Sequence, residues 1–475
     1  MNYVFFDLET SSRDHKFGQI LEFAGILCND NFQILDEPFV LKSRLIEGTI
    51  PEVGALLVTN TTPQMLKKRN LSHYDMIKQI LKISTKWSPA IWTGWNVIDF
   101  DFNYIRSTFY KTLNEIYFHQ FHGNKRSDIL VTARAANLFY PGCLKIPMNQ
   151  EGKQNFKLDQ IASLNGINHD AKHSALSDTQ AVYEMAKIIK DKAPNLWKAS
   201  LMTCSKTEIN QIVEKEKIFV TAETYYGKTV PFVLTFCCYH PKYAAYAMCL
   251  DLKHSPDSYM TMSYAQLKSE LKKSPKILRT VRANKFVVLM NGNYAKNFEG
   301  YRQIGIDKLI ERANIIAANK EFKDRVSQIL LEEADEKEML DTNLEQEPEE
   351  QIYSGGFNKT PKDEKLILEF HEKNDWKEKF LISEKFDDSR FVYFAQRLIY
   401  EESPSSLPET VYKKIHRRIA EQINSLNDEK WNTLAKSTKE IDDLRVKHEN
   451  DEQKLKLLDD IDEFLSEIKQ KYENA

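Results

Sequence analysis

The stretch YVFFDLET (residues 3–10) joins a strongly apolar run to two acidic residues. Its apolar half is typical of a buried β-strand. Side chains alternate along a strand, so Asp7 and Glu9 share one face, roughly 7 Å apart at the edge of an apolar core. Two like charges are unfavourable there unless something positive lies between them, and a cation is the simplest candidate.

The composition of the chain is that of an ordinary globular protein. Its 475 residues are 42% apolar and 28% charged, which favours roughly three domains with substantial cores. The net charge of −3 means that any nucleic-acid-binding surface is local rather than global. Six scattered cysteines without a CxxC pair are typical of reduced thiols in a cytoplasmic protein.

No membrane segment is expected, because the most apolar stretch, Val230 to Tyr239, is too short to span a bilayer. No secretory signal is expected either, since the first strand begins directly after Met1. We therefore expect a cytoplasmic location and no contact with a membrane.

Residues 1–195 are typical of an α/β domain with a mixed sheet between helices. Thr62 and Pro63 mark a helix start as N-cap and first helical residue. The strands are expected at Tyr3–Leu8, Phe23–Cys28, Ile34–Leu41 and Ala90–Thr93. The further helices are expected at Phe102–Leu113, Ile129–Leu138, Leu158–Leu164 and Ala175–Lys190.

The remainder of the chain divides into two regions. Residues 196–345 begin with short β-rich runs, which predict a small barrel or sheet, and continue with a helical extension. Residues 332–350 are dominated by acids, and we expect a linker there. Residues 352–475 are charged and helically periodic, which predicts a helical C-terminal domain.

Two later segments add acids and a histidine. In TGWNVIDFDFNYIR (93–106), Asp101 opens a helix after a turn at the mouth of the sheet, where ligand sites of α/β folds collect. In HDAKHSALSDTQAVYEMAK (169–187), His173 precedes a helix and Asp178 falls about one turn inside it. Taken singly, these residues are typical of a helix cap, a loop histidine and a solvated acid.

Taken together, the three segments resemble the DEDDh exonucleases. The motifs are D-x-E near the N-terminus, F-D after a G-x-N turn, and H-x-x-x-x-D at a late helix, in that order. The resemblance extends to the bacterial exonuclease I family over nearly the whole chain. Stretches that carry it are PEVGALLVTNTTPQ (51–64), RSDILVTARAANLFYP (126–141), NFKLDQIASLNGINH (155–169) and IYSGGF (352–357).

This resemblance implies a fold and a reaction. The fold would be a ribonuclease-H-like exonuclease domain, an SH3-like β-barrel domain and an α-helical C-terminal domain. The reaction would be 3′→5′ hydrolysis of single-stranded DNA to 5′-mononucleotides, in DNA repair or recombination. The family also implies a monomer that binds the acidic C-terminal tail of single-stranded-DNA-binding protein.

The resemblance also assigns roles to residues. Asp7, Glu9, Asp101 and Asp178 would hold two Mg²⁺ ions, with Mn²⁺ as a substitute, and the metals would relieve the repulsion between Asp7 and Glu9. His173 would be the general base, because an imidazole pKa near 6.5 suits that task. The expected substrate contacts are Glu9, Thr10 and Lys157. Trp92 and Trp95 are candidates for base stacking, although core packing is the expected role of at least one.

A basic run, KSELKKSPKILRTVRANK (268–285), lies outside these motifs. One interpretation is a solvated surface. The other is a phosphate-binding track in which Lys272, Lys273 and Lys276 hold an incoming strand.

Two alternatives to the leading function stay open. Related DEDDh enzymes trim RNA ends, and the ribose 2′-OH is the group that distinguishes the substrates. A catalytically inactive single-strand-binding module is the second alternative, disfavoured because all five catalytic positions keep the required chemistry.

Overall fold

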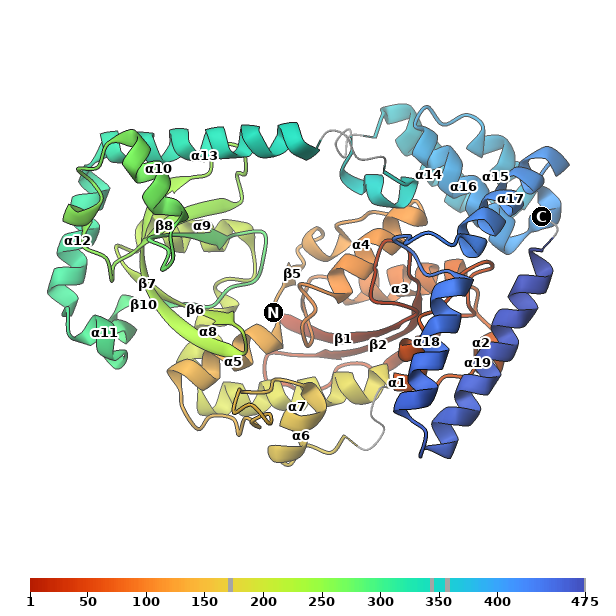
Figure 1. The fold of residues 1–475 in the computed structure, drawn as a ribbon, viewed down its shortest axis with the longest axis horizontal. Helices are drawn as coiled ribbons and strands as arrows, with labels where there is room; N and C mark the ends of the chain where they lie inside the picture. Colours follow the sequence, from red (N-terminus) through yellow and green to blue (C-terminus); the bar gives the residue numbers. More distant parts are fainter. Residues whose placement is uncertain (170–173, 342–345, 355–358, 474–475) are drawn as a thin grey trace.

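The computed structural model describes residues 1–169, 174–341, 346–354 and 359–473. It contains a mixed α/β region, a second β region with long flanking helices, and a helical C-terminal region (Figure 1). The first and last of these regions are in contact although they are far apart in sequence, since α1 (Val53–Val58) packs on α18 (Leu434–Lys447) and α19 (Glu452–Lys471).

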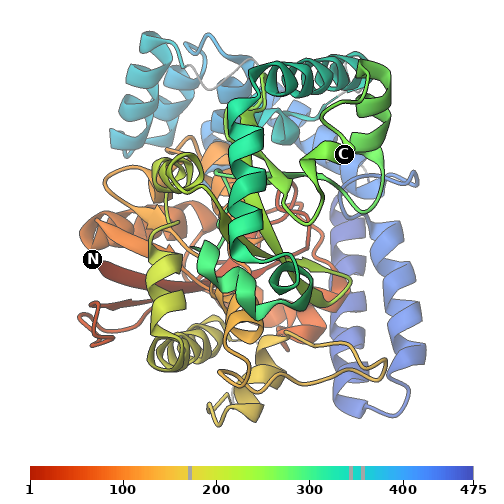
Figure 2. The same cartoon turned by 90° about the vertical axis from the view of Figure 1, so that its left-hand side faces the viewer.

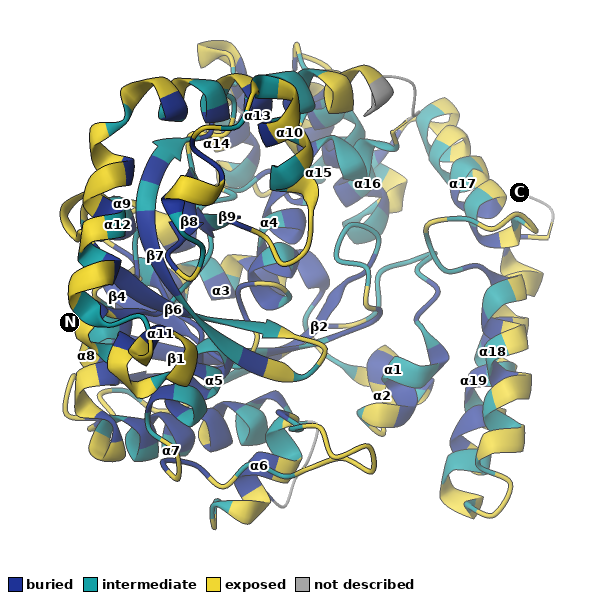
Figure 3. Cartoon of the chain, turned by 60° about the vertical axis from the view of Figure 1, so that its left-hand side comes forward, coloured by how far each residue is buried: buried dark blue, intermediate teal, exposed yellow. Residues whose placement is uncertain are grey.

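The first sheet has five strands in the order β3-β2-β1-β4-β5. Its strands are β1 (Asn2–Thr10), β2 (Ile20–Cys28), β3 (Phe39–Lys42), β4 (Ala90–Thr93) and β5 (Lys125–Arg126). Strand β1 pairs antiparallel with β2 and parallel with β4, so it lies at the centre of the sheet. Its apolar residues are buried on both faces, as the dark blue of β1 and β2 in Figure 3 shows. The apolar start of the chain is therefore the core strand that the sequence predicts.

Helices cover both faces of this sheet. Helix α7 packs across β1 and β2, and α3 packs on β2. The remaining helices of the region are α2 (Pro63–Lys68), α3 (His73–Trp87), α4 (Asp101–Lys111), α5 (Ile129–Phe139), α6 (Leu158–Leu164), α7 (Ala175–Lys192) and α8 (Pro194–Leu201). The expected cap is confirmed, because the side chain of Thr62 accepts a hydrogen bond from the amide of Met65, with Pro63 at the first helical position.

One expected strand is shorter than predicted. The run Ile34–Leu41 forms strand only from Phe39, while Ile34 makes an isolated bridge to Cys28. Between them Asp36 accepts a hydrogen bond from the indole of Trp87 at 3.0 Å, which turns this segment away from the ladder.

The second sheet is antiparallel, in the order β10-β6-β7-β8-β9. Its strands are β6 (Phe219–Tyr225), β7 (Lys228–Tyr239), β8 (Tyr246–Asp251), β9 (Leu278–Arg282) and β10 (Leu289–Asn291). Its helices are α9 (Lys206–Lys215), α10 (Tyr264–Lys272), α11 (Glu299–Arg302), α12 (Ile306–Ala318) and α13 (Lys320–Asp341). Helix α12 crosses the front of this region when the molecule is viewed from that side (Figure 2).

The expected linker at 332–350 is wrong in its first half, because α13 continues to Asp341. Distant lysines stabilise the acidic turns of this helix. Lys268 contacts Glu332 at 2.9 Å, and Lys242 contacts Asp335 at 2.5 Å. A charge run that repels itself in isolation is thus neutralised by the neighbouring α10 and β-region loops.

The C-terminal region is helical, as expected, and shares a core with the first region. Its other helices are α14 (Pro361–Glu372), α15 (Trp376–Ser383), α16 (Ser389–Glu402) and α17 (Glu409–Asn424). Leu21, Ile50 and Val53 of the first region lie in one apolar cluster with Phe394 and Ile461. None of the described helices is long and apolar enough to cross a lipid bilayer.

Candidate active site

Strand β1 carries the first two acids to the edge of the first sheet. Asp7 lies opposite Ala24 on β2, and Glu9 lies opposite Glu22, after which a bulge ends the regular pairing. Glu22 is 5% exposed and forms an ion pair with Lys42 at 2.8 Å. Glu22 therefore has a cation from the chain itself, whereas none of the described ion pairs involves Asp7 or Glu9.

Asp101 reaches the same edge from the start of α4. It is 3% exposed, and the backbone amide of Leu8, between the two acids of β1, lowers the pKa of its carboxyl group, although burial outweighs this effect. The close approach depends on Gly94, where a Cβ would lie 2.4 Å from the carbonyl oxygen of Phe6. Asp101 is the first residue of α4, and no side-chain hydrogen bond caps this helix.

A further buried acid holds the turn before α4. Asp128 is 1% exposed and accepts hydrogen bonds from the amides of Asn96 at 3.2 Å and Ile98 at 3.0 Å, besides capping α5. The sequence analysis missed this residue, because only the folded chain brings residues 96–98 beside it. It fixes the loop that delivers Asp101.

Helix α7 supplies the fourth acid. One carboxylate oxygen each from Asp7, Glu9 and Asp178 lies within 4.8 Å of the other two. The structure thus brings together the D-x-E pair and the acid of the H-x-x-x-x-D motif, with Asp101 close enough for its charge to raise the pKa of Asp7.

The electrostatics of this cluster are unfavourable without a cation. Burial and the charges of Asp101 and Asp178 raise the pKa of Asp7 well above its ordinary value. Burial and the charge of Asp178 raise the pKa of Glu9 to about 8, and burial raises the pKa of Asp101 to about 8. The fold therefore concentrates negative charge that its own described cations leave unneutralised.

The residues present fit a divalent cation. All donors are carboxylate oxygens, the ligands that Mg²⁺ prefers. In addition, one oxygen of Asp101 is buried without a hydrogen-bond partner among the described residues. A buried polar atom of this kind needs a partner, and a cation at the cluster would supply one.

Two histidines, His169 and His173, precede α7 in the sequence. His173, the expected general base, lies outside the described residues. His169 is 8% exposed, and its Nε2 contacts Oδ1 of Asp178. The sequence analysis passed over His169, and its only signal was its place in the same short segment, nine residues before the acid.

The expected substrate contacts lie at different exposures. Thr10 is 9% exposed and donates its hydroxyl to the carbonyl of Ser12 at 2.9 Å. Lys157 is exposed at the start of α6, and it makes no ion pair with any residue that the structure describes. Trp92 is 2% exposed and packs on Phe6, so its expected role in the core is confirmed. Trp95 is partly buried and donates to the carbonyl of Phe156 at 3.2 Å.

The lysines of the basic run lie on and after α10, away from the carboxylate cluster and beside α13 (Figure 1). Lys272 contacts Glu333 at 3.4 Å and Lys273 contacts Glu270 at 2.7 Å. Lys276 is exposed without a described ion pair. The acids of α13 therefore reduce the positive charge that the sequence of this run implies.

A basic and aromatic hollow of about 510 Å³ lies where the first region meets the second. It is lined by Arg106, Tyr117, Gln120, Phe121, Arg126, Asn284 and Tyr353. Burial and the charge of Arg106 lower the pKa of Arg126 to about 10. Neither arginine forms an ion pair with a carboxylate in the described part of the chain. Arg106 shares helix α4 with Asp101, which links this hollow to the acidic cluster.

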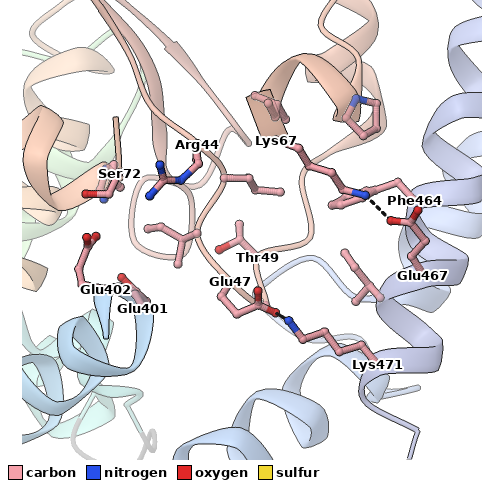
Figure 4. A pocket seen from close by; sticks show the side chains of 17 residues that line it. Arg44, Glu47, Thr49, Lys67, Ser72, Glu401, Glu402, Phe464, Glu467 and Lys471 are labelled. Carbon is pink, nitrogen blue, oxygen red and sulfur yellow. Dashed lines mark hydrogen bonds and ion pairs between the residues drawn. The ribbon is translucent and has the colours of Figure 1, made fainter. Parts of the chain in front are cut away.

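A second hollow, of about 440 Å³, lies between the first region and the C-terminal helices (Figure 4). Two of its acids pair with lysines: Glu47 contacts Lys471 at 2.8 Å, and Glu467 contacts Lys67. Glu401, which also lines it, pairs with Arg397 at 2.8 Å. The pairs of Glu47 and Glu467 join the two regions, and in having cationic partners these acids differ from Asp7 and Glu9 of β1.

Two family models match the chain: the one described as "Exonuclease" at residues 4–186, and the one described as "Exonuclease I C-terminal domain" at residues 346–468. The chain belongs to the exonuclease I family. The first match contains all four acids of the cluster, and the second contains nearly all of the C-terminal helices.

The chain is similar to relatives in the exonuclease I family over different shares of its length. Exodeoxyribonuclease I of Haemophilus influenzae is 24% identical, over 98% of each chain. Exodeoxyribonuclease I of Buchnera aphidicola subsp. Schizaphis graminum is 29% identical, over 48% of each, so that alignment spans about half of the relative. Escherichia coli exonuclease I, solved with a dA16 oligonucleotide, superposes with a TM-score of 0.82 at 21% identity, over 98% of this chain and 99% of that one. The expected fold is therefore confirmed over nearly the whole chain.

Proposed function

We propose that the protein is a metal-dependent exonuclease that hydrolyses single-stranded DNA from its 3′ end and releases 5′-mononucleotides. The observation that carries this proposal is the meeting of Asp7, Glu9 and Asp178 oxygens within 4.8 Å, beside the buried Asp101, in an exonuclease-family domain. The DNA preference rests on the relatives, which bear the name exodeoxyribonuclease I.

The metal site would consist of Asp7, Glu9, Asp101 and Asp178, holding two Mg²⁺ ions with Mn²⁺ as a substitute. Divalent ions supply a nucleophilic water at neutral pH and neutralise charge on the phosphate. The raised pKa values of Asp7, Glu9 and Asp101 support this assignment, because only bound cations would keep so many buried carboxyls ionised together at neutral pH.

Other residues of the chain act around that site. His173 takes the proton from the attacking water as general base. Glu9 and Thr10 hold the terminal nucleotide, and the exposed Lys157 contacts a phosphate of the strand. His169 is a positioning residue: its contact with Oδ1 of Asp178 orients the carboxylate.

Specificity for single strands is supported by the hollow around Arg106 and Arg126. A positively charged groove with aromatic side chains is the usual means of holding unpaired bases and their phosphates. The hollow offers two arginines without carboxylate partners in the described ranges, together with Tyr117, Phe121 and Tyr353. It lies on the α4 side of the cluster, where the strand would leave the terminal nucleotide.

The deciding experiment uses one oligonucleotide labelled at either end. With Mg²⁺, the 3′ label is released as a mononucleotide at once, whereas the 5′ label passes through a ladder of shortening products. EDTA stops both reactions. Matched RNA and double-stranded DNA run beside it. If RNA is degraded as fast as DNA or faster, the proposed preference for DNA is wrong. If the 5′ label is released first, the proposed 3′→5′ direction is wrong.

The role of His169 has its own test, a titration of Mn²⁺ binding by calorimetry without DNA. His169→Ala is expected to weaken metal binding by about 10–100-fold, while His169→Gln, which keeps a donor near the same place, restores part of it. Equal affinity in the wild type and His169→Ala would remove His169 from this role.

One partner follows from the relatives. A solved structure contains SSB with exonuclease I. We expect this chain to bind the acidic tail of single-stranded-DNA-binding protein as a monomer. Fluorescence anisotropy with the tail peptide, against a peptide lacking its terminal phenylalanine, tests the contact, and light scattering tests the monomer.

A further inference from the structure

The tip of the β6–β7 hairpin has an unusual residue in its turn. Tyr225 pairs with Lys228, so Tyr226 and Gly227 alone form the turn. Both have positive φ, +49° and +79°. Two-residue hairpin turns of this kind favour Asn, Asp or Gly at both positions, because a bulky side chain in the left-handed region is strained.

Burial does not compensate for this conformation. The side chain of Tyr226 is 95% exposed, and that of Tyr225 is 47% exposed. A large ring held in solvent on a strained backbone is the kind of outlier that points to a binding role.

The stem below the tip is braced. Arg279 donates to Glu223 at 3.2 Å and to the hydroxyl of Tyr225 at 3.3 Å, and its guanidinium lies over the ring of Phe232. Thr224 and Thr229 share a hydrogen bond of 3.0 Å across the two strands. The hairpin therefore presents Tyr226 from a fixed support, which lowers the entropy lost on binding.

The tip lies against the first region. A Cβ on Gly227 would be 3.6 Å from the carbonyl oxygen of Gln154 and from the Cβ of Lys153. In Figure 3 the β6–β7 hairpin extends from the second sheet across the front of the first. The second sheet thus places an exposed aromatic ring on the loop that precedes α6.

That loop is tied to the edge that carries the acids. Its Phe156 accepts the hydrogen bond from Trp95, which follows β4. Thr93, at the end of β4, lies beside Phe5 of β1, two residues before Asp7. The tip of the hairpin and the carboxylate cluster therefore belong to the same end of the first sheet.

The charges around the tip complement a phosphate backbone. Lys157 and Lys228 are exposed, and neither forms an ion pair with a residue in the described ranges. Lys228 directly follows the turn, and Lys157 lies at the start of α6, just after the loop that the tip contacts. An exposed aromatic ring with such lysines matches the chemistry of a single strand, in which a base stacks while its phosphates contact cations.

We infer that Tyr226 is a stacking platform for one base of the single strand, on the 5′ side of the nucleotide being removed. The inference rests on the proposed function and adds a contact from the second sheet that the exonuclease motifs do not include. It also explains why the turn keeps a tyrosine where asparagine would be less strained.

The test measures binding of a 5′-fluorescent oligothymidylate in EDTA, where no hydrolysis is expected. Tyr226→Asn removes the ring and favours the same turn, so the variant should melt no lower than the wild type. Its affinity should fall by about 5–100-fold, the range for loss of base–aromatic stacking. Tyr226→Phe, the matched control, keeps the ring and should bind like the wild type.

A set of oligonucleotides with one abasic residue moved along the strand identifies the base. Wild type should lose affinity at one position, and Tyr226→Asn should be insensitive at that same position. Wild-type affinity in Tyr226→Asn, or an unchanged abasic profile, would overturn the inference even if the enzyme degrades DNA. Failure of the wild type to degrade single-stranded DNA with Mg²⁺ would instead overturn the proposed function.

Discussion

Two groups of buried acids in this molecule are built in opposite ways. In the hollow of Figure 4, the pKa of Glu47 is raised by burial but lowered further by hydrogen bonds from Lys471 and Tyr472, so it lies below its ordinary value. At the edge of the first sheet, burial and neighbouring carboxylates raise the pKa of Glu9 to about 8.

The difference lies in the source of the positive charge. Glu47 and Glu467 of the interface have lysines from another part of the chain, so they join two regions. The acids of β1 and α4 have no such cationic partners among the described residues, so their charge is available to an external cation. Burial of acids without a lysine or arginine, rather than burial itself, distinguishes a metal site from a structural one.

The largest effect is expected from substitutions in the carboxylate cluster at the edge of the first sheet. Asp7→Asn, Glu9→Gln, Asp101→Asn and Asp178→Asn should each nearly abolish hydrolysis, because the remaining ligands cannot replace the missing charge. Each should also raise the melting temperature in EDTA, because it removes repulsion. Glu47→Gln is the matched control: hydrolysis stays normal while unfolding becomes easier by about 0.2–1 kcal/mol. An active variant with a normal melting temperature would exclude that acid from the site.

A smaller effect is expected for His173, the proposed general base. His173→Ala should slow the chemical step by about 10²–10⁴-fold and leave Mn²⁺ affinity unchanged, since the base does not hold the metal. Single-turnover kinetics and calorimetry separate the two. A single-turnover rate near that of the wild type would assign the base to another residue.

The comparison of paired and unpaired charges also applies to the lysines at the end of α10 and after it. Because Lys272 and Lys273 already pair with acids, replacing them and Lys276 with Glu should have a modest effect, namely fewer cuts per encounter on a long strand with trap DNA. The slope of log affinity against log salt should fall by about 0.7 for each phosphate that the variant no longer neutralises. An unchanged slope and unchanged run length would show that these lysines do not contact the DNA.

The smallest effect is expected for Glu402, an interface acid whose pKa is raised by burial, as that of Glu9 is. Burial raises the pKa of Glu402 from 4.5 to about 7, although a hydrogen bond with Ser72 opposes the shift. The folded state then holds a proton that the unfolded chain releases, so stability should fall as the pH rises from about 4.5 to 7. Glu402→Gln should melt higher than the wild type at pH 8 and should lose part of this pH dependence. If the melting temperatures of the wild type and Glu402→Gln depend on pH in the same way across that range, the raised pKa of Glu402 is contradicted.

Local patterns in the sequence were sufficient for much of the fold. The YVFF run is the central strand β1, β4 begins and ends as expected at Ala90 and Thr93, and α6 spans Leu158–Leu164 as expected. Such elements follow from side-chain period, caps and turn residues, which act over a few positions.

The shared face of Asp7 and Glu9 could also be predicted from the sequence, because a strand places residues i and i+2 on one face whatever surrounds it. By contrast, the approach of Asp178 on α7, the support of Asp101 by Asp128, and the contact of His169 with Asp178 join segments from distant parts of the chain or across a loop.

What the sequence by itself determined is therefore the central strand, most helices, and the acidic residue types that metal-dependent phosphodiester hydrolysis requires. The tertiary structure alone decided which charges are neutralised: Lys42 pairs with Glu22 rather than Glu9, and acids of α13 pair with the basic run. It also decided that Tyr226 lies beside the loop before α6. The physical reason is range, since backbone preference acts within a few residues, whereas an ion pair depends only on distance in the folded molecule.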